Sequence, residues 1–197
     1  MISDSTPAPR PDETDGRRRR SLDSRARIIA AVLKLTREGE INPSAELVAD
    51  RAGVGLRTVF RHFSDMESLY REVGDVIEAE IRPLAARPFQ SVSWRERIIE
   101  MISRRSEGYE VLGPFRRASD LRRHASPVLQ DDLARLTATL RQILLRELPA
   151  DLDPTTIEAL DLLLSYEAWS RLRQEQGLDQ TTARRVLERT VRALIDD

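Results

Sequence analysis

The sequence predicts an all-α fold, with a small N-terminal three-helix domain followed by a C-terminal bundle of longer helices. Apolar residues recur at spacings of three and four along most of the chain, as they do on the buried face of a helix. Serine or aspartate residues suited to begin a helix precede several of these stretches. No segment shows the alternation of apolar and polar residues that is typical of a strand, so helices are the only regular elements expected.

Composition predicts a globular protein of the cytoplasm. Of the 197 residues, 40% are hydrophobic and 33% are charged, which is enough apolar material for a buried core. The chain has no cysteine, so disulfides and thiolate metal sites are excluded. No stretch approaches the roughly 18 apolar residues of a membrane span, and the first residues lack the apolar core of a signal peptide. We therefore expect a cytoplasmic protein with no membrane contact.

Positive charge is concentrated near the N-terminus. The whole chain has a net charge of −1, but residues 17–62 hold 11 basic against 5 acidic residues, a net charge of +6. Residues 1–16 carry a net charge of −3 and residues 63–197 one of −4. A local basic segment of this kind is typical of contact with a polyanion.

The N-terminal segment is expected to be an arm rather than a helix. Residues 1–16 are rich in Pro, Ser, Thr and Asp, and residues 17–20 are four arginines. This composition predicts that residues 1–20 form a disordered, basic-ended arm. A first helix is expected to begin at Ser21 or Ser24 and to end at Gly39.

Two short helices and a longer one are expected next. Ser44 is suited to begin the first of them, Gly53 to end it and Gly55 to open the second. Asp65 is expected to cap the longer helix, and Pro83 is expected to end it.

The remaining helices are predicted from the same start and stop signals. Ser93 and Glu96 form a capping-box pattern, and the helix that they begin is expected to end before Gly113. A short connector helix is expected over residues 114–124.

Serine or aspartate followed by proline marks two later starts, at 126–127 and 153–154. The helix after Asp153 has apolar residues around most of its circumference up to Leu172, which indicates burial on more than one side. A last amphipathic helix is expected from about Asp179.

Residues 52–63, AGVGLRTVFRHF, contain the strongest functional signal. A helix that begins at Gly55 is expected to place apolar residues on one face and hydrogen-bonding residues on the other, and Gly53 and Gly55 are expected to relieve the tight turn before it. The apolar set is Leu56, Val59, Phe60 and Phe63, and the polar set is Arg57, Thr58 and Arg61. Arginine can bind a guanine edge or a phosphate, and threonine a phosphate or a thymine methyl group. The segment predicts the turn and reading helix of a helix-turn-helix, although spacing alone also fits a solvated helix junction.

Residues 25–73 resemble the N-terminal DNA-binding domain of the TetR family of transcriptional regulators. The matching pattern runs from Ser44 through VADRAGV and RTVFRHF to Leu69. The resemblance implies that Ser44 starts the first helix of the motif, that residues near 55–61 meet DNA, and that His62 and Phe63 pack the helix against its neighbours. It also implies a C-terminal domain that binds a small molecule and dimerises through its last two long helices.

Three positions depart from the family pattern. Phe60 stands where the family usually has a tyrosine whose hydroxyl meets a phosphate, so Phe60 is open to interpretation as a core residue only. Met66 replaces a common phosphate-binding lysine, and Pro43 replaces a frequent threonine. We expect the arginines of residues 17–20 to offset this weakened anchoring as a flexible arm in the minor groove, the alternative being a solvated tail.

The expected contact residues form two groups. The DNA-binding candidates are Ser44, Gly55, Leu56, Arg57, Thr58, Phe60, Arg61, Arg19 and Arg20. Pockets between bundle helices are lined by aromatic and apolar groups. The effector-binding candidates are therefore Trp94, Tyr109, Phe115, Tyr166 and Trp169, each of which is also a candidate for simple core packing.

No catalytic or metal constellation is apparent. The two histidines, His62 and His124, lie far apart in the sequence without a nearby carboxylate cluster, so neither a metal nor a cofactor is expected. We find no phosphate-binding loop and no nucleophile–base set, and an enzyme is not expected.

We expect a homodimeric transcriptional regulator, most simply a repressor that a small-molecule effector releases from a palindromic double-stranded DNA operator. The expected domains are the arm of residues 1–20, a DNA-binding domain of residues 21–70 and an effector and dimerisation domain of residues 71–197. Two alternatives are an activator or effector-independent regulator, and a helical ligand-binding or interaction protein whose DNA-binding motif has decayed.

Overall fold

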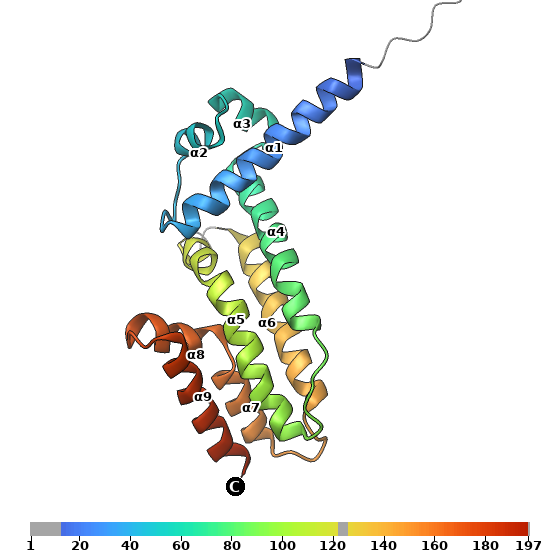
Figure 1. Ribbon diagram of the computed structural model, residues 1–197, viewed down its shortest axis with the longest axis vertical. Coiled ribbons are helices and arrows are strands. Elements are labelled where there is room, and N and C mark those ends of the chain that lie inside the picture. The colour runs from blue at the N-terminus through green and yellow to red at the C-terminus, as the bar shows by residue number, and fades with distance from the viewer. Residues whose placement is uncertain (1–12, 122–125, 197) are drawn as a thin grey trace, which may run out of the picture. The chain divides into compact units, whose positions relative to one another are not determined.

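The computed structural model describes residues 13–121 and 126–196, and every regular element in these ranges is a helix (Figure 1). The predicted all-α fold is confirmed. The chain divides into two compact units, Met1–Val73 and Gly74–Asp197. None of the helices in the described ranges is long and apolar enough to cross a bilayer.

The first unit is built on a long helix, α1 (Glu13–Arg37), that contacts two short ones, α2 (Ala45–Ala52) and α3 (Leu56–His62) (Figure 1). The first residues of α4 (Met66–Ala86) complete it. Apolar side chains from all four helices are buried together: Ile28, Val32, Leu35, Val48, Val59, Leu69 and Val73.

The start of α1 corrects the predicted arm. The helix begins at Glu13, so the four arginines of residues 17–20 lie on its first turns and residues 13–20 are not disordered. Arginine has a high helix propensity, which favours extension of α1 toward the N-terminus. Ser24 does not cap the helix, because its hydroxyl donates to the carbonyl of Arg20 inside it. The part of the predicted arm before residue 13 lies outside the described residues.

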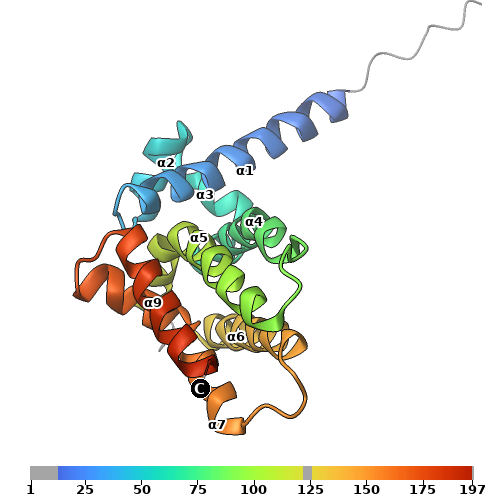
Figure 2. The same ribbon diagram turned by 60° about the horizontal axis from the view of Figure 1, so that its bottom comes forward.

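The second unit is a bundle in which α5 contacts α6, α8 and α9 (Figure 2). Its elements after α4 are α5 (Trp94–Asp120), α6 (Pro127–Glu147), α7 (Pro154–Leu163), α8 (Tyr166–Ser170), the π-helical segment η2 (Arg171–Glu175) and α9 (Gln180–Ile195). Its buried core includes Ile98, Met101, Ile102, Leu144, Leu160, Leu164, Trp169 and Val191.

Most of the predicted helix starts are confirmed by capping hydrogen bonds. Ser44 accepts from the N–H of Leu47, and Ser126, Asp153 and Asp179 each accept in the same way from a backbone N–H three residues later. Asp65 likewise accepts from the N–H of Ser68 over 2.7 Å. These side chains satisfy N–H groups that have no partner within the helix.

The capping box at the start of α5 is not formed. Ser93 precedes the helix, but its side chain accepts no capping hydrogen bond. The carboxylate of Glu96 instead accepts from the guanidinium of Arg192 on α9. A partner distant in the sequence has therefore replaced the local one.

Two predicted helix ends, at Pro83 and before Gly113, are wrong. Pro83 is within α4, which continues to Ala86, and Pro114 is within α5, which continues through Gly113 to Asp120. No separate connector helix forms over residues 114–121. A proline removes one backbone hydrogen bond but leaves the later ones available, so a helix packed against its neighbours can continue past it.

The apolar helix predicted after Asp153 is interrupted. Its first part, α7, ends at Leu163, and Ser165 caps a new helix by accepting from the N–H of Ala168. The segment then continues as η2. The predicted single helix up to Leu172 is therefore wrong, because a second cap competes with its continuation.

Candidate DNA-contacting surface and effector cavity

A glycine-dependent turn joins α2 to α3. Gly53 has a φ of 63° and a ψ of 41°, the left-handed conformation that side chains disfavour. The N–H of Gly53 donates to the carbonyl of Asp50 and that of Val54 to the carbonyl of Ala49, which is the Schellman arrangement of hydrogen bonds. Gly55 has a φ of −73°, so the expected conformational role of glycine applies to Gly53 but not to Gly55.

The outer face of α3 differs from the predicted one. Val59 and Phe63 are buried, as expected, and Arg57 and Arg61 are exposed, as expected. Phe60, however, is 48% exposed and Leu56 is 37% exposed. The face toward the core is centred on Val59, so the interpretation of Phe60 as a core residue is wrong.

The two arginines of α3 lie beside this apolar pair. Arg57 and Arg61 are separated by four residues, as are Leu56 and Phe60, so each pair lies along the same side of the helix. Thr58 is partly buried. The exposed surface of α3 therefore combines an apolar row with a basic row.

Arg25 positions α3 from the side of α1. Its Nη1 donates to the carbonyl of His62 over 2.8 Å, and its Nε donates to Oε2 of Glu72 over 3.0 Å. Its guanidinium also lies 4.6 Å from the centre of the Phe63 ring, within reach of a cation–π interaction. The end of α3 is thus held by a charged contact that the sequence did not single out.

His62 packs inside this arrangement, as the family resemblance implies. Its side chain is partly buried, and Nε2 has no hydrogen-bond partner among the described residues. Burial, together with the positive charges of Arg61 and Arg25, lowers the pKa of His62. A neutral imidazole is therefore favoured at this position.

The remaining DNA-binding candidates lie at the surface of the first unit. Ser44 and Gly55 are exposed immediately before α2 and α3, and Ser44 already uses its hydroxyl as a cap acceptor. Arg19 and Arg20 are exposed on the first turns of α1. Their placement on a helix corrects the flexible-arm prediction.

The second unit contains a cavity of about 120 Å³ between α5 and the segment formed by α8 and η2. Its lining consists of Tyr109, Glu110, Gly113, Pro114, Arg117, Tyr166, Trp169, Ser170, Arg173 and Gln174. Three of the five effector-binding candidates, Tyr109, Tyr166 and Trp169, therefore line one cavity. Trp94 and Phe115 do not line it: Trp94 packs against the core and Phe115 is buried.

Both walls of this cavity are irregular helices. Pro114 lies within α5 and has no backbone N–H to donate, and Arg173 and Gln174 belong to the π-helical η2. Short π-helical segments are frequent at functional sites. The location of the cavity therefore coincides with the backbone irregularities of the second unit.

A carboxylate organises one side of the cavity. Glu110 accepts hydrogen bonds from Nε1 of Trp169 over 2.9 Å and from Nε of Arg173 over 2.7 Å. The hydrogen bonds of Arg173, and then that of Trp169, lower the pKa of Glu110. Glu110 was not predicted as a site residue. The spacing of Trp169 and Arg173 places them on one helical face, but it does not indicate an acidic partner that is distant in the sequence.

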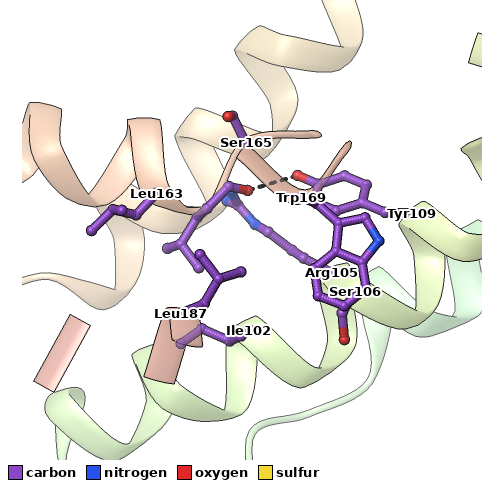
Figure 3. Close-up of a pocket in the computed structure, with 9 residues that line it drawn as sticks. Ile102, Arg105, Ser106, Tyr109, Leu163, Ser165, Trp169 and Leu187 are labelled. Carbon is purple, nitrogen blue, oxygen red and sulfur yellow. Dashed lines mark hydrogen bonds between the residues drawn. The ribbon is translucent and has the colours of Figure 1, made fainter. Parts of the chain in front are cut away.

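A second, smaller cavity of about 10 Å³ is also lined by Tyr109 and Trp169 (Figure 3). It has room for about one water molecule. The hydroxyl of Tyr109 and Nη1 of Arg105 both donate to the carbonyl of Leu164, at the end of α7. Burial raises the pKa of Tyr109 to about 12. Arg105, which was also not predicted as a site residue, thus supplies a hydrogen-bond donor to a carbonyl that has no partner within the helix because α7 ends there.

Among the residues that the structure describes, no group of three or more His, Asp or Glu side chains could hold a metal ion. The candidate sites are therefore a basic and apolar protein surface in the first unit and a polar cavity in the second.

The chain is similar to solved structures of transcriptional regulators and of a multidrug binding protein. It matches a transcriptional regulator from Rhodococcus sp. RHA1 with a TM-score of 0.69 and 18% identity, over 88% of this chain and 96% of the other. A TetR-family transcriptional regulator from Streptomyces coelicolor gives a TM-score of 0.65 and 18% identity, over 87% of this chain and 80% of the other. The multidrug binding protein EbrR, complexed with imidazole, gives a TM-score of 0.61 and 23% identity, over 84% of this chain and 88% of the other.

These similarities establish that the chain has the fold of TetR-family transcriptional regulators. Neither the family models nor the curated proteins compared with the sequence gave a match.

Proposed function

We propose that the protein is a sequence-specific DNA-binding transcriptional regulator of the TetR type. The observation that carries the proposal is the exposure of Arg57 and Arg61 on a short helix that follows a tight turn. The fold shared with TetR-family regulators supports it. In this proposal α3 enters the major groove, where arginine can bind guanine or phosphate.

Residues around α3 would add contacts to the DNA backbone. Ser44 and Thr58 carry hydroxyls suited to phosphate oxygens, and Gly55 leaves space for close approach of the backbone. Arg19 and Arg20 would contribute positive charge from the first turns of α1.

The functional unit would be a homodimer formed through α9 and the α7–α8 segment. Leu162 on α7 is 67% exposed and Val186 on α9 is 39% exposed, which supports contact of these helices with a second copy. A two-fold dimer would read a palindromic operator, with the half-sites one or more helical turns apart.

The effector would occupy the 120 Å³ cavity beside Tyr109, Tyr166 and Trp169. For comparison, an apolar cavity of about 150 Å³ in another protein binds benzene. The cavity of this protein is therefore large enough for a ligand with one small ring and too small for a ligand with several rings. Arg117 and Arg173 outnumber the single acid Glu110 in the lining, which favours a negatively charged ligand.

Regulation would follow from differential affinity. An effector that binds more tightly to a conformation with poor DNA affinity would release the protein from its operator, which makes repression the simplest mode of action. The free energy available for release is limited to the difference in effector affinity between the two conformations.

Alanine substitutions of the two α3 arginines test the proposal. We expect Arg57→Ala and Arg61→Ala each to weaken binding to the highest-affinity DNA fragment selected from a random pool by about tenfold or more. Arg135→Ala, at an exposed position of α6, is the matched control and should leave binding unchanged. If neither α3 substitution weakens binding, α3 is not the reading helix.

A further inference from the structure

The outer face of α3 carries an apolar row that the fold does not require. Val59 is 1% exposed and Phe63 is 2% exposed, so these two residues supply the contact of α3 with the core. Phe60 and Leu56 are 48% and 37% exposed. In the described part of the first unit only two other large apolar side chains, Leu22 and Leu47, are exposed to this extent.

The chemistry beside this row indicates its partner. Arg57 and Arg61 flank Phe60 in the sequence and are both exposed, so an occupant of this face has to be apolar at one point and anionic nearby. The C5 methyl group of thymine in the major groove has these properties, because it is the apolar feature of a base-pair edge and lies within a highly charged backbone.

We propose that Phe60 contacts a thymine C5 methyl group and thereby selects thymine at one position of each operator half-site, with Leu56 contacting a second thymine nearby. This inference rests on the proposed binding of α3 to DNA. Residues four apart on a helix are separated by about 6 Å along its axis, and base pairs by about 3.4 Å, so the two thymines would lie about two steps apart.

The absence of a hydroxyl on Phe60 is consistent with this role. A tyrosine could donate a hydrogen bond to a phosphate, whereas phenylalanine offers only an apolar surface to its partner. Burying that surface against a methyl group removes apolar area from water on both sides of the interface. The contact is independent of charge, so its contribution to affinity should vary little with salt concentration.

The test replaces single thymines by deoxyuridine, which removes the C5 methyl group and leaves base pairing intact. The probe is the highest-affinity duplex recovered by the full-length protein from random-sequence DNA. For the wild type we expect a loss of affinity at two thymines of each half-site, about two steps apart. At the thymine that Phe60 contacts, the loss should be about fourfold, the effect of burying one methyl-sized group. The loss should be the same at low and high salt.

Substitutions at Phe60 assign the contact. Phe60→Ala should bind the thymine and deoxyuridine duplexes with equal affinity at that position, and Phe60→Tyr, which keeps the ring, should retain the fourfold preference. Val92→Ala is the control, because it truncates an apolar side chain that is 93% exposed in the second unit. This variant should also retain the fourfold preference for thymine. Circular dichroism of each variant checks that the helices are intact.

The outcomes separate this inference from the proposed function. Specific binding that is insensitive to every thymine methyl group, or a methyl preference that survives at both thymines in Phe60→Ala, overturns the role of Phe60 and leaves the DNA-binding proposal standing. Failure to select any duplex overturns both.

Discussion

The guanidinium of Arg25 on α1 forms an ion pair with the carboxylate of Glu72 on α4 and also donates a hydrogen bond to the carbonyl of His62 at the end of α3. Nε of Arg25 lies 3.0 Å from Oε2 of Glu72, and Nη1 lies 2.8 Å from the carbonyl oxygen of His62. One side chain therefore connects three helices of the first unit. Because the end of α3 is fixed in this way, its outer face keeps one orientation relative to α1.

Double-mutant cycles should reveal this connection as a contribution to stability. We expect a coupling free energy of about 1 kcal/mol between Arg25 and Glu72, since both side chains are about two-thirds buried and the hydrogen bonds are charge-assisted. The more exposed pair of Arg82 and Glu78 is the control, with an expected coupling of about 0.3–0.5 kcal/mol. Urea unfolding of the single and double alanine variants measures both values. Equal couplings would show that the Arg25 contact does not fix α3.

The two glycines of the turn should respond differently to alanine. Gly53→Ala forces a side chain into a φ of 63° and is expected to lower the free energy of unfolding by about 1 kcal/mol. Gly55→Ala is the matched control, because φ is −73° and no atom lies within 4 Å of the added Cβ. Chemical denaturation of both variants distinguishes them, and a greater loss for Gly55→Ala would contradict the described turn.

The Glu110 network should make stability depend on pH in a defined direction. Since the folded-state pKa of Glu110 is lowered, its ionised form stabilises the fold above the unfolded-state pKa of about 4.3. That contribution is lost as the pH falls through the lower, folded-state pKa. The wild type should therefore be more stable than Glu110→Gln at pH 7, and the difference should shrink in acid.

Unfolding free energies of both proteins at a series of pH values from 7 downward check this expectation. Comparison with the variant removes the effect of the other carboxylates, which titrate in both proteins. A difference in stability that stays constant across the series would mean that the charge of Glu110 contributes nothing to the network.

Filling the 120 Å³ cavity should block ligand binding without unfolding the protein. Gly113 lines the cavity, and a Cβ added there would make only ordinary contacts of 3.5 and 3.8 Å. Benzoate serves as a probe because one ring with one carboxylate matches the size and charge of the site, and benzamide is its uncharged counterpart. We expect benzoate, but not benzamide, to raise the melting temperature of the wild type.

Gly113→Leu should abolish the shift produced by benzoate. Gly108→Leu is the matched control, since Gly108 lies on the same helix, does not line the cavity and has no atom within 4 Å of an added Cβ. A shift that persists in Gly113→Leu would place the binding of benzoate elsewhere.

Local signals in the sequence predicted where most of the helices begin. Ser44, Asp153 and Asp179 cap helices through their own side chains, an interaction that spans three residues and is visible in sequence. Helix ends were harder to predict, because Pro83 and Pro114 are tolerated within α4 and α5. Whether a proline ends a helix depends on its packing, which sequence does not specify.

The sites were predicted only in part for the same reason. Spacing placed Phe60 with Val59 and Phe63, yet neighbouring helices cover only the latter two, so Phe60 is exposed. Glu110 and Arg173 meet across 63 positions of the chain, and no local pattern connects them. Aromatic composition identified Tyr109, Tyr166 and Trp169, but the polar groups of the cavity became visible only in the folded chain.

The most direct test of the central claim is the affinity of the purified full-length protein for its best selected DNA fragment, relative to random DNA, at two salt concentrations. The proposed function predicts a palindromic site bound about 10³-fold or more tightly than random DNA. Weak binding that falls steeply with salt and selects no sequence would contradict it, since the arginines of α1 and α3 would then provide only non-specific attraction.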